Sequence, residues 1–238
     1  MITGASRGLG AGLAQAFHAR GLRLGLCARS APVLADGPDV VARRVDVRDS
    51  AAVAAFAGEV AARFGAIDLW INNAGLLEPI DPLRDVAEAA ARAHFEVNVL
   101  GVLFGTQAFV RHLRGRGGEG VLVNVSSGAA RKAYAGWSVY CAAKAAVDRM
   151  TECVALEEAA HGLRAYAVAP GVIDTDMQRL IRATPAARFP DVARFVEMKR
   201  ANDFNSPAFV ADHLLAIAFD PAARPAEVCV RLPDEAPR

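Results

Sequence analysis

The stretch Thr3-Gly4-Ala5-Ser6-Arg7-Gly8-Leu9-Gly10 decides the fold. Its three glycines permit a tight turn, because glycine adopts backbone conformations that other residues avoid. Small and apolar residues follow and predict a helix to about Arg20. The first N–H groups of such a helix have no partners within the helix and bind anions such as a pyrophosphate. The stretch therefore predicts a dinucleotide-binding turn between a strand and a helix.

Apolar runs alternate with helical patterns along the rest of the chain, as is typical of a parallel sheet. Only Met1-Ile2 precede the glycine turn, whereas a buried strand usually has about five residues. We therefore expect a clipped first strand, either because the start lies upstream or because residues are missing. Further strands are predicted at residues 22–28, 40–47, 67–71, 121–125, 163–168 and 228–232, and further helices at 49–65, 86–114 (in one or two pieces), 140–161 and 207–219. This pattern predicts one α/β domain, residues 1–238, with a Rossmann-type doubly wound parallel sheet.

The composition favours a small-molecule partner. A net charge of +1 without basic runs gives no electrostatic case for nucleic acid or an anionic membrane. The four cysteines are scattered without metal-ligand spacing, so we expect reduced thiols and no metal site. No leader pattern opens the sequence, and no apolar run reaches the ~18 residues of a membrane span. We therefore expect a cytoplasmic protein without a membrane segment.

A second stretch, Tyr140-Cys141-Ala142-Ala143-Lys144, places a phenol four residues before an ammonium group. In a helix this spacing puts both side chains on one face. A tyrosine has an ordinary pKa near ~10, and a neighbouring cation stabilises the phenolate. We therefore expect Lys144 to lower the pKa of Tyr140, so that the phenol exchanges protons at neutral pH. The alternative is a helix with one buried ring and one solvated charge.

The apolar run from Val121 to Val125 predicts a buried strand that ends in Ser126, Ser127 and Gly128. The carboxyl ends of the strands in a parallel sheet face the ligand crevice. Ser127 would then lie where its hydroxyl can hydrogen-bond the oxygen that Tyr140 protonates.

Four motifs in this order resemble the short-chain dehydrogenase/reductase family: the glycine stretch, Asn72-Asn73-Ala74-Gly75, Ser127, and Tyr140 with Lys144. The resemblance covers nearly the whole chain, and four ordered motifs are far more specific than one. It implies an enzyme, an NAD(P)-dependent oxidoreductase. The resemblance also implies a mechanism in which Tyr140 gives a proton to a carbonyl oxygen, Ser127 hydrogen-bonds that oxygen, and Lys144 binds the nicotinamide ribose.

The resemblance also implies how the cofactor is held. Asp46 would lie near the adenine, and the loop of residues 169–175 would grip the nicotinamide carboxamide. The expected cofactor-binding residues are Gly4, Ser6, Arg7, Gly8, Leu9, Gly10, Arg29, Ser30, Asp46, Val47, Asn73, Ala74, Gly75, Tyr140, Lys144, Pro170, Gly171, Ile173 and Thr175. Asn98 is implied as a fourth catalytic residue that holds a water connecting Lys144 to solvent; the alternative is a buried amide that the backbone satisfies.

Arg29-Ser30 follows the second predicted strand, where an NAD enzyme places an acidic residue for the ribose hydroxyls. Arg7 in the glycine turn supplies a second cation that could reach the same place. Two guanidinium groups suit a 2′-phosphate, so NADP(H) is favoured over NAD(H). The alternative is that both arginines are solvated surface charges.

Residues 176–206 predict a mobile helical lid over the substrate. Its Met177 and Phe195 could line a substrate pocket or pack in the core. On the Tyr140 helix, Val154 and Leu156 could pack against another subunit, and the resemblance implies a homodimer or homotetramer.

Within the family, the chain is most similar to sepiapterin reductase and benzil-reductase-like enzymes, in residues 136–142, 156–158 and 174–178. Sepiapterin reductases anchor the pterin with an aspartate in the last strand, and Arg231 occupies that position here. Because arginine cannot accept the pterin's N–H groups, an aromatic ketone or a dicarbonyl is the expected substrate rather than a pterin side chain. The alternatives are a 3-oxoacyl-carrier-protein reductase-like enzyme and a non-catalytic NADP-binding regulator.

Overall fold

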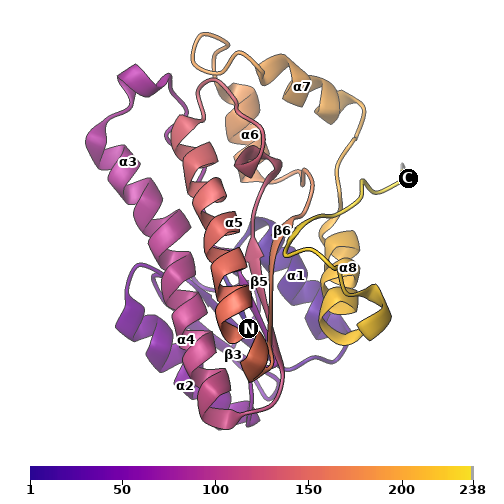
Figure 1. Cartoon of the computed structure of the whole chain (residues 1–238). Coiled ribbons are helices and arrows are strands. Elements are labelled where there is room, and N and C mark those ends of the chain that lie inside the picture. The colour runs from indigo at the N-terminus through magenta and orange to yellow at the C-terminus, as the bar shows by residue number, and fades with distance from the viewer. Residues whose placement is uncertain (237–238) are drawn as a thin grey trace.

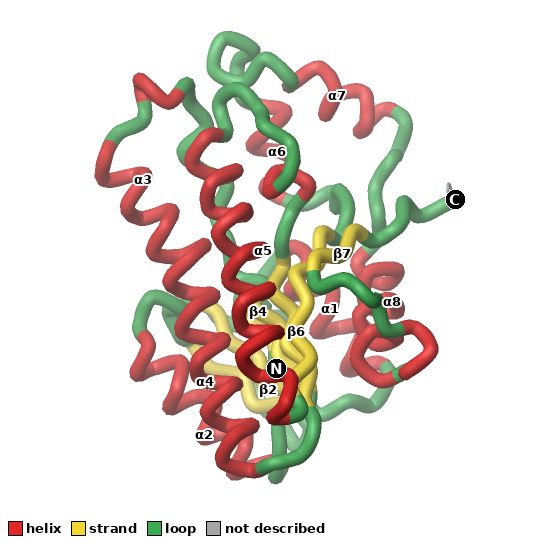
Figure 2. The backbone as a smooth tube through the Cα atoms, in the orientation of Figure 1, coloured by secondary structure: helices red, strands yellow, loops and turns green. Residues whose placement is uncertain are grey.

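Seven parallel strands form one sheet in the order β3-β2-β1-β4-β5-β6-β7 (Figure 1, Figure 2). The computed structural model describes residues 1–236. The strands are β1 Ile2–Thr3, β2 Leu24–Ala28, β3 Val40–Arg44, β4 Leu69–Asn72, β5 Gly120–Val125, β6 Leu163–Ala169 and β7 Cys229–Arg231. The chain order reverses between β1 and β4, which creates a crevice at the carboxyl ends of these strands. The predicted doubly wound sheet is confirmed, with a first strand of two residues.

Helices cover both faces of the sheet because its strands are apolar on both sides. Leu26 of β2 faces a core with α1 and α8, whereas its neighbour Cys27 faces a core with α2 and α4. Figure 1 shows α6 and α7 together at one end of the molecule. The helices are α1 Gly8–Ala19, α2 Ser50–Phe64, α3 Glu88–Phe95, α4 Gly101–Arg116, α5 Ser138–Glu158, α6 Asp176–Ala183, α7 Val192–Arg200 and α8 Pro207–Phe219. No helix within residues 1–236 has both the length and the apolar character needed to span a bilayer.

Local signals set both ends of α2. The Asp49 side chain accepts a hydrogen bond from Ala52 N (2.9 Å) and caps α2, which ends at Gly65 with φ +85°. The predicted helix of residues 86–114 is divided instead into α3, a π-helical turn at Glu96–Leu100, and α4. Apolar periodicity alone does not reveal the wider π turn, in which each backbone hydrogen bond spans one residue more than in an α-helix.

A buried network of side-chain hydrogen bonds joins β4, β5 and α5. Trp70 Nε1 donates to Asn72 Oδ1 (2.8 Å), and Asn72 Nδ2 donates to Asn124 Oδ1 (2.9 Å). Asn124 Nδ2 donates in turn to Thr151 Oγ1 (2.9 Å) on α5. Because each of these buried polar atoms has a partner, the network fixes how α5 lies on the sheet.

Gly105 on α4 packs against this network. A Cβ at this position would overlap Asn72 Oδ1 and lie 2.9 Å from Asn72 Cγ. We expect Gly105→Ala to lower the free energy of unfolding by about 2–4 kcal/mol, because the Asn72 amide must leave its partners. Gly58→Ala, at an exposed site of α2 with open space around it, should instead raise it by roughly 0.5–1 kcal/mol. Urea unfolding of both variants measures the difference, and equal effects would contradict the packing argument.

Candidate active site

A cavity of about 960 Å³ lies at the carboxyl ends of the strands. It is lined by the loops after β1 to β6 and by Arg231 at the end of β7. Of all the site residues predicted from the sequence, only Gly10 and Asn98 do not line this cavity. The structure therefore brings together groups that are more than 160 residues apart in the chain.

The glycine turn brings bare backbone to the cavity. Gly4 has φ +70°, and a Cβ there would lie 2.7 Å from Ala74 Cα. Gly8 has φ +58°, and a Cβ at Gly10 would overlap the Gly4 carbonyl oxygen. Arg7 is the N-cap of α1, but its side chain caps none of the first N–H groups. A helix start with uncapped N–H groups and no side chains in the way fits the pyrophosphate of NAD(P).

Thr3 and Asn73 clamp the glycine turn to the loop after β4. Thr3 Oγ1 accepts hydrogen bonds from Asn73 N (3.0 Å) and Ala74 N (3.1 Å), and Asn73 Nδ2 donates to Thr3 O (3.0 Å). The Asn73 side chain, expected to line the cofactor ribose, thus holds the turn while the residue still borders the cavity. The sequence reasoning gave Thr3 no role, although its place at the start of the glycine stretch was a signal.

Charged residues mark the cavity end that follows β2 and β3. Arg29 is exposed and borders the cavity directly after β2. A hydrogen bond from Arg48 (Nη2 to Oδ2, 2.7 Å) lowers the pKa of Asp46, and Arg29 adds to this effect. Arg7 Nη1 lies 3.5 Å from Asp176 Oδ2, but both side chains are exposed and such pairs are weak.

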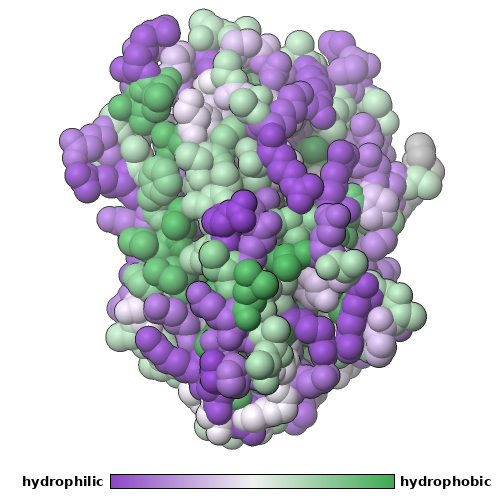
Figure 3. Space-filling model, viewed as in Figure 1, coloured by the Kyte–Doolittle hydropathy of each residue, from purple (hydrophilic) through white to green (hydrophobic). Residues whose placement is uncertain are grey.

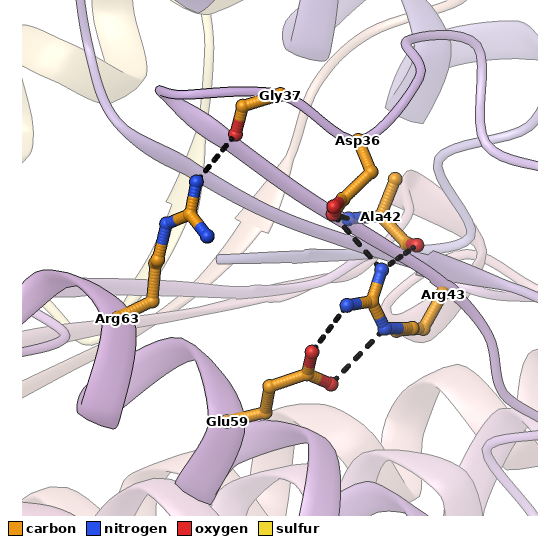
Figure 4. Close-up of polar contacts among 6 residues, drawn as sticks. All are labelled: Asp36, Gly37, Ala42, Arg43, Glu59 and Arg63. Atoms are coloured by element: carbon orange, nitrogen blue, oxygen red, sulfur yellow. Dashed lines mark hydrogen bonds and ion pairs between the residues drawn. The ribbon is translucent and has the colours of Figure 1, made fainter.

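The loop between Arg29 and β3 is tied to its surroundings by an ion-pair network (Figure 4). Arg43 Nη1 donates to Asp36 Oδ1 (2.9 Å), and its guanidinium also pairs with Glu59 on α2. Arg63 Nη2 donates to Gly37 O (3.1 Å). These contacts hold the loop against β3 and α2.

Tyr140 and Lys144 lie on one face of α5, as the spacing predicted, and are only 7% and 6% exposed. Ser127 follows β5, and its side chain interacts with Tyr140 so as to lower the pKa of the phenol. Ser127 Oγ also accepts a bond from Ala129 N (3.2 Å), which caps a short 3-10 turn. The structure therefore joins the serine, the tyrosine and the lysine at the cavity wall.

The ionisation of Tyr140 differs from the prediction. Burial raises the pKa of Tyr140, and the Ser127 hydrogen bond offsets this only in part. Lys144 Nζ donates to Val125 O (2.7 Å) and lies 5.8 Å from the centre of the Tyr140 ring. The expectation that Lys144 lowers this pKa is wrong for the protein alone, because the ammonium faces a carbonyl and the phenol has lost its hydration.

Burial lowers the pKa of Lys144 to about 8, and the charge of Asp148 opposes the shift. Asp148 lies one helical turn further along α5 and accepts a hydrogen bond from Ser126. Burial raises the pKa of the Asp148 carboxyl. Lys144 is thus a buried cation whose nearest acidic group is only partly buried.

Asn98 lies in the π turn, and its amide is bound to the backbone. Its Oδ1 accepts from Leu76 N (2.8 Å) and its Nδ2 donates to Leu76 O (2.7 Å). The same Nδ2 meets His94 Nε2 (2.6 Å), so this ring nitrogen accepts and His94 Nδ1 donates to Glu78 O (2.6 Å). Burial lowers the pKa of His94, in agreement with a neutral ring.

His94 was not predicted, although it precedes Asn98 by one helical turn. Its ring is fully buried and meets the Tyr140 ring edge to face at 6.0 Å. The alternative of a backbone-satisfied Asn98 amide describes what the structure shows, and the water-holding role of Asn98 stays a prediction. His94 and Asn98 together tie the loop of residues 76–78 to the helix beside Tyr140.

The loop of residues 169–175, which is expected to hold the nicotinamide carboxamide, is fixed by a hydrogen bond from Asn205. Buried Asn205 donates from Nδ2 to Pro170 O (2.9 Å), and Gly171 turns the chain with φ +79°. Ile173 and Thr175 then line the cavity, and Thr175 is the N-cap of α6.

Aromatic residues form the cavity end next to Tyr140. Trp137 stacks on Phe189 (4.5 Å between ring centres) and lies 5.6 Å from the Tyr140 ring. Phe195 and Met177 border the cavity, whereas Phe189 is buried in the core. The predicted lid segment therefore contributes α6 and α7 to this wall, and its mobility stays a prediction.

A doubly wound sheet with such a crevice, a glycine turn and a buried serine, tyrosine and lysine defines a dinucleotide-dependent oxidoreductase. The family model described as short chain dehydrogenase matches residues 1–186, and the chain belongs to this family. It is accordingly an oxidoreductase of the class that acts on alcohol or carbonyl groups. The family predicted from the four motifs is confirmed.

Three relatives illustrate the similarity. A cis-4-hydroxycyclohexanecarboxylate dehydrogenase of Sinomonas cyclohexanicum is 36% identical over 91% of this chain and 93% of the relative. A benzil reductase ((S)-benzoin forming) of Bacillus cereus is 36% identical over 59% of this chain and 57% of the relative. The crystal structure of a short chain dehydrogenase from Burkholderia cenocepacia J2315 in complex with NADP has 34% identity and a TM-score of 0.75, covering 98% of this chain and 86% of that one.

Proposed function

We propose that the protein is an NADPH-dependent carbonyl reductase that converts a ketone or dicarbonyl, an aromatic diketone in particular, into an alcohol. One observation carries this proposal. The buried Tyr140, with Ser127 beside it in the cavity wall and Lys144 one turn later on α5, borders the same cavity as the glycine turn. The proton donor and the dinucleotide cradle thus meet in one space.

Each residue of the site has a separate role in the proposed reaction. When bound, the nicotinamide supplies the hydride. Tyr140 donates its proton to the carbonyl oxygen, and its raised pKa keeps the phenol protonated at neutral pH. Ser127 donates a hydrogen bond to the same oxygen as negative charge develops there. Lys144 holds the ribose hydroxyls and provides a positive charge near the phenolate that forms, and Asn98 positions the loop at Leu76 and relays protons through a water.

The preference for NADPH rests on the cations at the adenosine end. Arg29 and Arg7 both border the cavity, and the Asp46 carboxylate is engaged by Arg48. We expect Arg29→Ala to lower kcat/KM for NADPH by about 10- to 100-fold, the value of one or two charge-assisted hydrogen bonds. The value for NADH should change little, because NADH carries no 2′-phosphate.

Steady-state kinetics with each cofactor measure this effect. Arg84→Ala is the matched control, since Arg84 is an exposed arginine outside the cavity that pairs with its neighbour Asp85. Equal losses with both cofactors in Arg29→Ala would contradict a 2′-phosphate site.

Arg231 supports the proposed substrate class. It lies at the end of β7, in register with Ala169 of β6, and borders the cavity. A guanidinium has donors only, so it cannot bind the N–H groups of a pterin. The similarity to a benzil reductase favours an aromatic diketone instead.

Oxidation of NADPH and NADH against a small panel tests the proposal. The panel contains benzil, sepiapterin, an acetoacetyl thioester and simple aldehydes. NADPH-dependent turnover of benzil without sepiapterin is the expected result. Turnover of the thioester alone would favour a 3-oxoacyl-carrier-protein reductase, and tight NADPH binding with no turnover would favour a regulator.

Assembly into a homodimer or homotetramer is part of the proposal. Figure 3 shows hydrophobic residues along the face that carries α4 and α5, between hydrophilic ones. Leu156 of α5 is 83% exposed, and Leu100, which ends the π-helical turn before α4, is 40% exposed. Exposed large apolar side chains on α5 and on the π-helical turn before α4 support a subunit contact.

A further inference from the structure

The cations of α6 and α7 are nearly all neutralised by carboxylates. Arg179 pairs with Asp176, Arg182 and Lys199 pair with Asp174, and Arg200 pairs with Glu197. Arg194 is the exception: among residues 1–236, no carboxylate lies within ion-pair distance of it. It borders the catalytic cavity instead.

Arg194 is held by an aromatic neighbour. Its Nη1 donates to Tyr134 Oη (3.1 Å), and its guanidinium lies 5.8 Å from the centre of the Phe195 ring. Because the Tyr134 oxygen accepts this bond, its own O–H can donate to a ligand. Tyr134 also borders the cavity, so the pair presents N–H and O–H donors to it.

The surroundings of this pair are positive. Lys132 Nζ lies 4.9 Å above the Tyr134 ring. Arg231 borders the same cavity, and its contact with Asp234 (3.2 Å) is an exposed pair of the weak kind. Of the cavity carboxylates, Asp46 and Asp176 are paired with arginines, and the charge of Glu78 acts on Arg188. A site rich in donors and cations suits an anion.

Aromatic ring contacts connect the Arg194–Tyr134 pair to Tyr140, the proposed proton donor. The Tyr134 ring is 5.0 Å from the Trp137 ring, which is in turn 5.6 Å from the Tyr140 ring. Trp137 thus contacts both rings, and we infer a spacing of about one aromatic ring between a group bound at Tyr134 and the carbonyl at Tyr140. Trp137, Phe195 and Leu180 supply apolar surface for that spacer.

We propose that Arg194, together with Tyr134, binds a carboxylate of the substrate, with Arg231 as a second cation. The inference rests on the proposed carbonyl reduction and narrows its substrate class. The preferred compounds are ketones or diketones that carry a carboxylate one ring away from the reacting carbonyl.

Matched acid and ester substrates test this inference. We compare 4-carboxybenzil with its methyl ester and with benzil, at saturating NADPH and low salt. The wild-type protein should prefer the acid in kcat/KM by about tenfold or more, the value of a charge-assisted contact. Because salt screens exposed charges, 0.5 M NaCl should reduce the rate with the acid more than the rate with the ester.

Arg194→Gln should lose about tenfold of the preference for the acid and keep its activity on the ester. Arg231→Gln should have a smaller effect, since Asp234 offsets part of its charge. Arg200→Gln is the control, because Arg200 is an exposed arginine on the same helix that pairs with Glu197 outside the cavity. Should Arg194→Gln fail to fold, Tyr134→Phe removes the O–H donor and keeps the ring.

The two hypotheses fail in different ways. Equal rates with acid and ester in the wild-type protein, or a preference that Arg194→Gln and Tyr134→Phe leave intact, would overturn the carboxylate site. Absence of turnover with the acid, the ester and benzil alike would instead overturn the proposed carbonyl reduction.

Discussion

Tyr140→Phe is expected to lower kcat by about 10²- to 10⁴-fold, the range attributed to a positioned general acid. The variant removes one oxygen, and with it the proton donor and the partner of Ser127. The ring keeps its edge contacts with His94 and Trp137, so we expect the fold and NADPH binding to be retained. Steady-state turnover and NADPH fluorescence titration measure the two properties separately.

Tyr166→Phe is the matched control for this experiment. Tyr166 is buried in β6 within the core that contains α1 and α8, away from the catalytic cavity. The same loss of one hydroxyl should leave turnover unchanged. A Tyr140→Phe variant that still reduces ketones at the wild-type rate would be incompatible with the proposed mechanism.

The sequence predicted the fold and most of the residues that line the cavity, because both depend on short-range spacing. The glycine turn, the apolar strands and the Asp49 cap are local signals that tertiary packing did not override. Ser127 follows β5, and Tyr140 and Lys144 lie in the first two turns of α5; the parallel sheet dictates the directions of both elements. Their convergence on one cavity follows from that topology.

Features that depend on distant segments were not predictable in the same way. The engagement of Asn98 requires Leu76, 22 residues away, to lie opposite the π turn. Arg194 acquires its place only because α7 folds back onto Tyr134, 60 residues earlier in the chain. The raised pKa of Tyr140 reflects burial by several elements, whereas the sequence displays only the nearby lysine.

Under the proposed mechanism, Lys144→Met should lower kcat/KM by about 10²-fold, because the variant lacks the cation proposed to hold the ribose hydroxyls. In the wild-type protein, the pKa of Lys144 is lowered to about 8 by burial. The rate should therefore fall as the pH rises through 8, and the variant should lack this decline. Asp148→Asn should move the decline to lower pH, since the Asp148 charge raises the pKa of Lys144.

Lys144→Met is also expected to stabilise the folded protein at neutral pH. A pKa below the ordinary 10.5 means that the fold disfavours the ammonium form, so below pH 8 the charged lysine destabilises the native state. Between pH 8 and 10.5 the native state loses its proton before the unfolded state does, and the penalty fades. Allowing for the lost bond to Val125 O, we expect Lys144→Met to raise the free energy of unfolding by roughly 1–3 kcal/mol at pH 7.

Urea unfolding of wild type and Lys144→Met at pH 7 and pH 10 tests this argument. The stability gain should be largest at pH 7 and shrink at pH 10. A variant that is less stable than wild type at pH 7 would show that the hydrogen bond to Val125 outweighs desolvation of the ammonium. The predicted combination, lower activity with higher stability, would mean that the chain keeps a buried cation for catalysis at the expense of its fold.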